Sequence, residues 1–129
     1  MHKFIYAQKD SWIAENSSSR NYGGDEVLEL FKDFRTDWSG SYTTGVSRIL
    51  LQFDLTDISS SIVSGDISSD AKYYLKLYST EASELSHTYN IEAFPLVRSW
   101  EEGTGHRSDT PYVSDGVSWK YADSRDPSS

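Results

Sequence analysis

The chain has 129 residues, the length of one domain, and it is long enough to bury a core without a disulfide or a metal. A formal net charge of −8, with no block of Lys and Arg, argues against nucleic acid and anionic membrane surfaces as partners. The absence of cysteine excludes disulfides, zinc–thiolate sites and thiol catalysis, and no apolar run has the length of a membrane span or a secretion signal.

Apolar and polar residues alternate with a period of two, which predicts β-strands. The alternation is clearest in RILLQFDL (48–55) and is repeated in KYYLKLYS (72–79). It is weaker in EVLELFK (26–32) and in TYNIEAFPLV (88–97), where Pro95 indicates an edge strand or a strand end. Shorter candidates for strands are residues 4–7, 12–14 and 117–121.

Polar turn segments separate these candidates, and the segment 41–44 has the composition of a hairpin loop. Helical signals are confined to single turns in 56–67, with Thr56 or Asp57 as N-cap, and in 79–86. Short strands between polar loops predict an all-β fold, an antiparallel β-sandwich of jelly-roll type, in one domain over residues 1–129.

The end of the sequence is unusual for such a fold. Residues 122–129 are polar and contain no further apolar strand, so we expect a frayed tail or the start of a further segment. Two explanations stay open: a neighbouring chain closes the sandwich, or the sequence is a fragment of something longer. In either case the sandwich is expected to be incomplete at its C-terminus.

The stretch RSWEEGTGHRSDTP (98–111) gathers residues that could carry chemistry. Glu101 and Glu102 are adjacent, so an extended backbone points them to opposite faces rather than at one substrate bond. HRSD (106–109) is too short for a Ser–His–Asp triad, and there is no Gly-x-Ser-x-Gly motif. We therefore predict no catalytic residues and no enzymatic activity.

Metal sites are weakly indicated. The histidines His2, His87 and His106 are far apart and lack the spacing of transition-metal ligands. A structural calcium ion stays open, because calcium accepts loosely spaced oxygen ligands. Its candidate ligands are Asp10, Asp25, Asp54 and Asp109.

Aromatic residues form 14% of the chain and supply much of its apolar area. Trp100 and Trp119 are expected to anchor the core, whereas Trp38, in TDWSGSY, is expected to be exposed. The residues that we expect at a protein interface or on a platform for sugar rings are Phe4, Tyr6, Trp38, Tyr42 and Tyr112.

The order of motifs resembles that of the DNRLRE-type β-sandwich domains. The matching motifs are Asn21-Tyr22-Gly23, Phe53-Asp54-Leu55, Leu75-Lys76-Leu77-Tyr78, Trp100-Glu101-Glu102-Gly103 and Val117-Ser118-Trp119. Two longer stretches, ISSSIVSGDIS leading into LKLYSTEASEL and WEEGTGHRSDTPYVSDGVSWKYAD, are similar to a branch found as virion structural proteins of large tailed bacteriophages. Members of the family usually continue past the Val-Ser-Trp motif into another strand, which this chain barely does.

The resemblance implies a β-sandwich located in a virion, where it packs against other particle proteins and copies of itself without catalysing a reaction. Neck, sheath, baseplate, fibre and capsid surface are all open as positions in the particle, with the tail and neck and a role in host attachment among the settings considered. An alternative is a carbohydrate-binding module that recognises a cell-surface or extracellular polysaccharide through exposed Trp and Tyr, since some DNRLRE-type domains accompany polysaccharide-active modules. No cofactor, nucleic acid or membrane is expected as a partner in either case.

Overall fold

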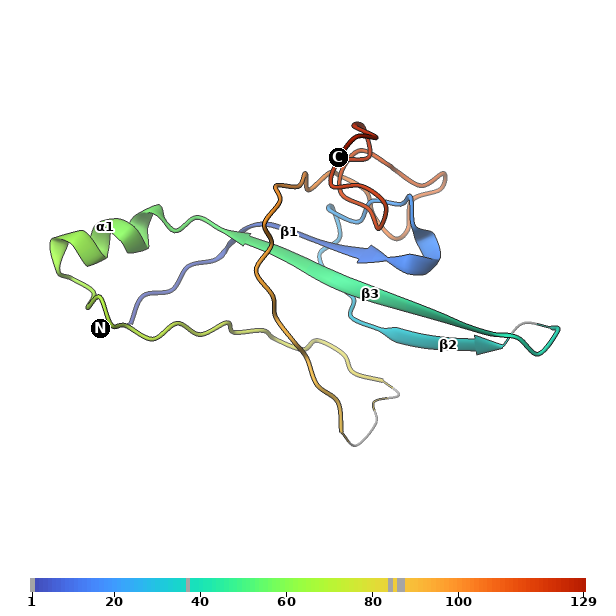
Figure 1. Cartoon of the computed structure of the whole chain (residues 1–129), viewed down its shortest axis with the longest axis horizontal. Coiled ribbons are helices and arrows are strands. Elements are labelled where there is room, and N and C mark those ends of the chain that lie inside the picture. The colour runs from blue at the N-terminus through green and yellow to red at the C-terminus, as the bar shows by residue number, and fades with distance from the viewer. Residues whose placement is uncertain (1, 37, 84, 86–87) are drawn as a thin grey trace. The chain divides into compact units, whose positions relative to one another are not determined.

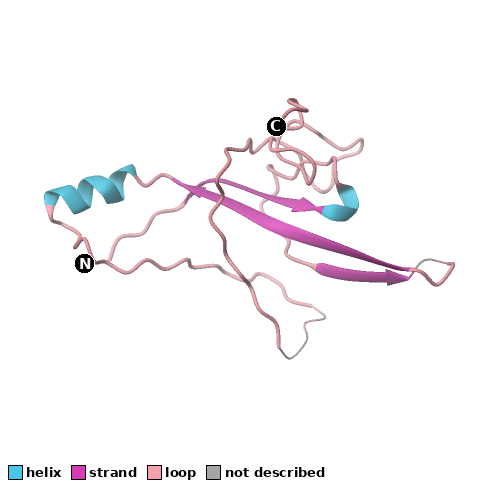
Figure 2. Cartoon of the chain, viewed as in Figure 1, coloured by secondary structure: helices cyan, strands magenta, loops and turns pink. Residues whose placement is uncertain are grey.

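The structure is a computed structural model that describes residues 2–36, 38–83, 85 and 88–129. Its elements, in chain order, are β1 (Ala7–Ala14), the 3-10 turn η1 (Glu15–Ser17), β2 (Lys32–Thr36), β3 (Tyr42–Phe53) and helix α1 (Thr56–Ser64) (Figures 1 and 2). The chain divides into two compact units. Residues 3–54 and 98–129 form one unit, and residues 1–2 and 55–97 form the other.

The larger unit contains a three-stranded antiparallel sheet in the order β1-β3-β2. The long strand β3 lies in the middle, as Figure 1 shows. Trp12 pairs with Ile49, and a register shift between Ala7 and Lys9 marks a bulge at the beginning of β1. The all-β expectation is thus met by an antiparallel sheet with one short helix. The predicted strands at 12–14 and 48–55 fall largely within β1 and β3.

Three expectations about the sheet are corrected. Residues 4–7 enter β1 only at Ala7. The strand expected at 26–32 begins at Lys32, because Phe31 and the residues before it pack on the sheet as irregular backbone. Residues 42–44, expected in a hairpin loop, belong to β3, because the ladder with β2 extends to the pair Thr36 and Tyr42.

The hydrophobic core lies on one face of β1. Trp12, Ala14 and Tyr22 are buried, and the ring of Trp12 stacks on that of Tyr22 with centroids 3.7 Å apart. Phe31 meets the Trp12 ring edge-on at 6.2 Å, and Leu28, Phe31 and Ile49 pack around the cluster. Such aromatic pairs contribute about 0.5–1.5 kcal/mol beyond area burial.

The opposite face of the sheet is covered by the C-terminal segment. Because side chains alternate along a strand, Lys9 and Arg48 project away from the Trp12 face. The Nζ of Lys9 lies 5.7 Å from the Trp100 ring, and the guanidinium of Arg48 lies 4.9 Å from the Trp119 ring. Trp100 and Val117 are buried, which confirms that Trp100 belongs to the core, whereas Trp119, expected there as well, is half-buried.

The C-terminal segment is irregular. Residues 117–121, expected as a strand, are irregular with a bend at 119–120, and the Ser118 N–H donates to the Tyr121 carbonyl. The expected frayed tail is tied down at its first residues, because the Ala122 carbonyl accepts from the Glu101 N–H and the Ser124 N–H donates to the Gly116 carbonyl. These two hydrogen bonds attach Glu101 and Gly116, near the two ends of the loop segment 98–116, to residues 122–124.

The smaller unit contains α1, which confirms the helical turn predicted in 56–67. The expected caps are wrong, because Leu55 is the N-cap and no side chain caps the first turn. At the other end Gly65 adopts φ +83° and donates its N–H to the Ile62 carbonyl, an αL helix stop that glycine tolerates. No helix within the described residues has the length and apolarity needed to cross a membrane.

Residues 72–79 and 88–97 are not strands, which corrects two strand predictions. Both segments are exposed, and none of their described residues belongs to a ladder. Their alternation is typical of strands, but a strand also needs a neighbour for its N–H and C=O groups. The helical turn expected in 79–86 does not form in its described residues, while positions 84 and 86 lie outside them, as does His87.

Candidate functional site

Asn21 holds the 102–117 loop against the N-terminal half of the larger unit. Its side chain is fully buried, and Nδ2 donates to the carbonyl oxygens of Glu102 at 2.8 Å and Val117 at 2.9 Å. Its Oδ1 accepts from the N–H groups of Gly23 at 3.1 Å and Gly105 at 2.9 Å. Both amide donors and both acceptor positions are therefore used, which is the condition for burying such a group without a large penalty.

Glycines make this close approach feasible. A Cβ on Gly103, whose φ is +76°, would lie 2.4 Å from Asn21 Oδ1. A Cβ on Gly105 would lie 2.3 Å from the Asn21 carbonyl oxygen. Any side chain at either position would collide with the buried amide, so these glycines shape the loop around Asn21.

Arg20 binds the backbone of residues 106–109, the part of the loop that follows Gly105. Its Nη2 donates to the carbonyl oxygens of His106 at 2.9 Å and Asp109 at 3.0 Å, and also to that of Arg107. The guanidinium lies 5.4 Å from the centroid of the Tyr22 ring. One cation thus holds three loop carbonyls against the stacked aromatic pair.

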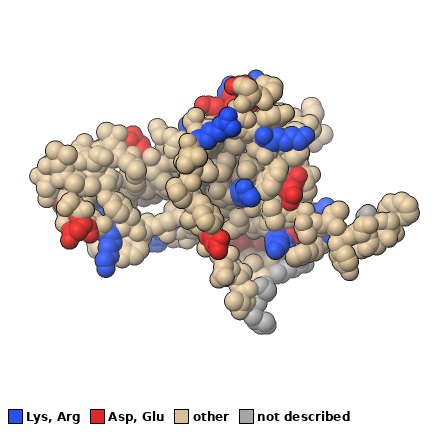
Figure 3. Space-filling model, viewed as in Figure 1, with Lys and Arg blue, Asp and Glu red and all other residues tan. Residues whose placement is uncertain are grey.

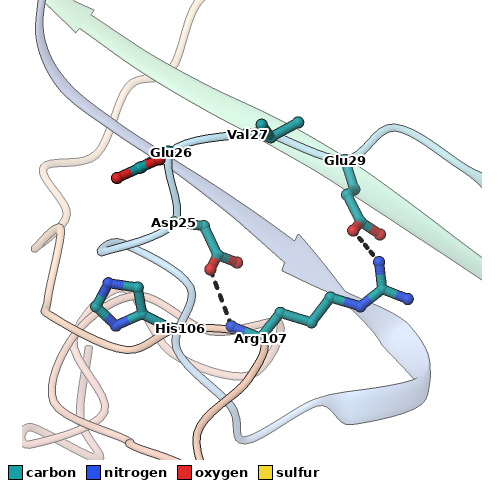
Figure 4. A pocket seen from close by; sticks show the side chains of 6 residues that line it. All are labelled: Asp25, Glu26, Val27, Glu29, His106 and Arg107. Atoms are coloured by element: carbon teal, nitrogen blue, oxygen red, sulfur yellow. Dashed lines mark hydrogen bonds and ion pairs between the residues drawn. The ribbon is translucent and has the colours of Figure 1, made fainter. Parts of the chain in front are cut away.

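Asp25 joins the loop to the core. One carboxylate oxygen accepts from the Trp12 indole N–H at 2.9 Å, and the other accepts from the Arg107 N–H at 2.9 Å. The Arg107 guanidinium also pairs with Glu29. Figure 4 shows the contacts of Arg107 with Asp25 and Glu29, which lie beside a hollow of about 290 Å³. The residues that line this hollow are Asp25, Glu26, Val27, Glu29, His106 and Arg107.

Two further carboxylates of the loop region serve its architecture. Glu102 accepts from the Asp10 N–H at 2.8 Å, and burial together with the Glu102 charge raises the pKa of Asp10. Asp115 accepts from both the N–H and the hydroxyl of Thr104. Burial would raise the pKa of Asp115, but these hydrogen bonds outweigh it and lower that pKa.

The stretch 98–111 is therefore a hydrogen-bonded loop. Glu101 is exposed, whereas Glu102 turns toward β1, so the two adjacent carboxylates do not converge. His106 Nδ1 lies 3.8 Å from an Asp109 carboxylate oxygen, which accepts from the His106 N–H at 2.7 Å. This geometry closes a tight turn.

The four aspartates considered as calcium ligands each have contacts of their own. Asp25 accepts a hydrogen bond from the Trp12 indole, Asp109 accepts one from the His106 N–H, and Asp10 lies near the Glu102 charge. Within the described part of the chain, no three His, Asp or Glu side chains come close enough together to hold a metal ion. Asp54 makes contacts of its own at the end of β3.

All five aromatic interface candidates are exposed, but they do not form one platform. Trp38 is fully exposed, as expected, and Tyr42, the first residue of β3, is 80% exposed. Phe4 and Tyr6 precede Ala7, which pairs with Phe53 at the far end of β3. With 12 residues and a rise of about 3.3 Å each, β3 separates the two pairs by roughly 36 Å.

Tyr112, 55% exposed, belongs to the C-terminal loop region. The five candidates therefore present at least two separate surfaces. Sequence reasoning did not find Asn21 and Arg20 as the residues that organise the loop. Their only signal was the Asn-Tyr-Gly motif beside a loop that contains several glycines.

Comparisons with protein-family models, with curated proteins and with solved structures find no match to this chain.

Proposed function

We propose that the chain is a non-enzymatic structural component of a tailed-phage virion. In this proposal β1, β3 and β2 form one layer of an antiparallel β-sandwich, and contacts with other particle proteins complete the second layer. The resemblance to DNRLRE-type domains motivates the virion setting, and the exposed, strand-patterned segments motivate the assembly step.

The observation that carries the proposal is the exposure of residues 72–79 and 88–97. Leu75 and Leu77 are 51% and 54% exposed, and Ile91 is 59% exposed, although all three stand at the apolar positions of an alternating pattern. Apolar side chains in such a row gain free energy when a partner covers them, at about 25 cal/mol per Å². Contiguous exposed apolar surface of this kind marks interaction sites.

Charge does not favour nucleic acid. On the face drawn in Figure 3, Lys and Arg side chains are interspersed with Asp and Glu. A phosphate backbone is bound by a continuous basic stripe, which the sequence also lacks.

Hydrogen exchange in particles tests the proposal. Amides of residues 72–79 should exchange rapidly in the free chain and at least about tenfold more slowly in purified particles of the virus that encodes it. Amides around Trp12 serve as an internal control, because they lie in the buried core of the larger unit and should be protected in both states. Absence of the chain from particles, or unchanged exchange of 72–79 within them, contradicts the proposal.

A matched pair of variants sharpens the test. Replacing Leu75 and Leu77 by Ser should lower incorporation into particles, because the covered apolar row is lost. Replacing Val63, which is 89% exposed on α1, by Ser should leave incorporation unchanged. Equal incorporation of both variants counts against this interface.

Glycan binding is a second candidate function, and the exposed pair Trp38 and Tyr42 at the hairpin turn favours it. A sugar ring stacks on such side chains, so Trp38→Ala should abolish polysaccharide binding measured by titration calorimetry. Phe94→Ala, which removes an exposed aromatic ring that is not among the platform candidates, is the control. No binding by the unaltered chain contradicts this function.

A further inference from the structure

The outer edge of β2 is open. Among the described residues, β3 is the strand that pairs with β2, on its other side. The residues of β2 are exposed apart from the half-buried Asp33. Open edges of this kind are templates for pairing with another strand.

Hydrogen bonds beside β2 show which of its backbone groups face outward. The Phe31 carbonyl accepts from the Ser47 N–H at 3.0 Å, and the Arg35 carbonyl accepts from the Thr43 hydroxyl at 3.4 Å. Odd-numbered residues therefore direct their N–H and C=O groups toward β3. In an antiparallel ladder the intervening residues direct theirs the opposite way, so Lys32, Phe34 and Thr36 present theirs at the open edge.

The sequence of β2, Lys-Asp-Phe-Arg-Thr, complements itself in the antiparallel direction. When two copies pair about a two-fold axis at Phe34, each Phe34 faces the other. Asp33 of each copy then lies opposite Arg35 of the other, so the ion pair that Asp33 and Arg35 form within each copy, at 3.4 Å, is exchanged for one of two ion pairs between the copies. Lys32 lies opposite Thr36, so every outward-facing backbone group finds a partner.

The side chains favour this register. Cross-strand aromatic pairs and opposite charges each contribute about 0.2–1 kcal/mol. Phe34 is 68% exposed and shares a face with Tyr42, because Phe34 pairs with Thr44 and Thr36 with Tyr42. Pairing of two copies would therefore place Tyr42, two Phe34 rings and the second Tyr42 along one face.

Two other strand-like segments of the chain fit this edge less well. Residues 72–79 carry Lys72 and Lys76 and no acid, so they bring more positive charge to Lys32 and Arg35. Residues 88–97 offer one acid, Glu92, where self-pairing offers two ion pairs.

We propose that β2 is a self-association site, at which two copies of this chain join edge to edge about a two-fold axis at Phe34. The joined sheet has the order β1-β3-β2-β2-β3-β1. The contact is isologous, so it closes a dimer and does not propagate into a filament. It does not depend on the proposed virion function.

A charge-exchange experiment tests this site on the full-length chain. Asp33→Arg places a second guanidinium opposite Arg35 of the other copy, and Arg35→Asp places two acids opposite each other. Each variant alone should dimerise about tenfold or more weakly than the unaltered chain in sedimentation velocity. An equimolar mixture of the two variants restores opposite-charge pairing and should recover the dimer.

A second pair of variants tests the backbone. Phe34→Pro removes the N–H that faces the open edge and is compatible with an edge strand, so the chain should fold and remain monomeric. Phe34→Val keeps the N–H and should retain more of the dimer. Near-ultraviolet circular dichroism of the Trp12–Tyr22 stack verifies that each variant is folded.

A monomeric unaltered chain at all accessible concentrations would overturn the proposal. Self-association that survives both charge variants, or a mixture that fails to recover the dimer, would overturn it as well. Because the purified chain suffices, these outcomes are separate from the particle measurements.

Discussion

The side-chain amide of Asn21 donates to the carbonyl oxygen of Val117 at 2.9 Å, across 96 positions of the sequence. The same nitrogen donates to the Glu102 carbonyl, and the side-chain oxygen accepts from Gly23 and Gly105. A single buried side chain thus joins residues from both halves of the larger unit. Several expected outcomes of substitution depend on this junction.

Asn21→Asp should lower the free energy of unfolding by about 3 kcal/mol or more. The carboxylate has the same shape but loses both N–H donors, and it brings negative charge against the carbonyls of Glu102 and Val117. Urea unfolding followed by tryptophan fluorescence measures the change. Asn90→Asp adds the same charge at an exposed position and should change stability by less than about 0.5 kcal/mol.

Gly105→Ala should destabilise the larger unit by about 1–3 kcal/mol or more, because its Cβ would lie 2.3 Å from the Asn21 carbonyl oxygen. Gly45→Ala is the matched control, since a Cβ there meets the Asn16 side chain at 3.5 Å, an ordinary contact. That control should change the midpoint of thermal unfolding little. Similar shifts for both variants would show that the loop yields around Asn21.

Trp12→Phe should cost about 1–3 kcal/mol of stability, measured by urea unfolding. The variant keeps an aromatic ring for Tyr22 but removes the indole N–H that donates to Asp25 at 2.9 Å. Removing the Asp25 charge as well, in Trp12→Phe with Asp25→Asn, should cost less than the sum of the two single changes. A strictly additive result would mean that the hydrogen bond does not couple the two residues.

Asp115 predicts a loss of stability in acid. Its folded pKa lies below the ordinary value of 3.8 because the Thr104 hydrogen bonds favour the charged form over the cost of burial. The Asp115 carboxylate therefore contributes its full stabilisation of the folded state above pH 3.8, and this stabilisation is lost as the pH falls through the folded pKa of Asp115. Thr104→Val removes the hydroxyl donor and should flatten this part of the stability profile. An unchanged acid limb in the variant would contradict the assignment.

The raised pKa of Asp10 predicts the opposite dependence of folding stability on pH. Burial and the Glu102 charge raise its folded pKa above 3.8, so the folded state binds the proton more tightly than the unfolded state. The ionised Asp10 carboxylate therefore destabilises the folded state. This loss of stability is absent at low pH and reaches its full size as the pH rises through the folded pKa of Asp10. Asp10→Asn should therefore raise stability at neutral pH and leave it nearly unchanged in strong acid. Equal effects at both pH values would show that charge is not the cause.

The sequence predicted the sheet best where its pattern reports a half-buried surface. The alternation of 48–55 located the C-terminal half of β3, and Trp100 was expected in the core for its place in one of the motifs that resemble the DNRLRE-type pattern. The alternation of 72–79 is equally regular, yet that segment is no strand. Alternation describes which faces a segment can bury, whereas strand formation depends on a neighbour whose position the local sequence does not specify.

The hydrogen bonds that organise the 102–117 loop could not be predicted from the local sequence for a related reason. Asn21 resembles a turn residue because Gly23 follows it closely. Its main partners, Glu102, Gly105 and Val117, are more than 80 positions away. A buried polar side chain of this kind is recognisable only when its partners have been brought to it.

The interruption of the larger unit by residues 55–97 has a kinetic consequence. Asn21 cannot complete its hydrogen bonds until Val117 has been synthesised, so the growing chain keeps this amide hydrated until then. Once Val117 is available, the closing entropy grows only with the logarithm of the intervening length, and halving the interruption would lower it by about 0.6 kcal/mol. Folding of the larger unit is therefore timed by the synthesis of its last sheet-covering residues far more than by the length of what separates them.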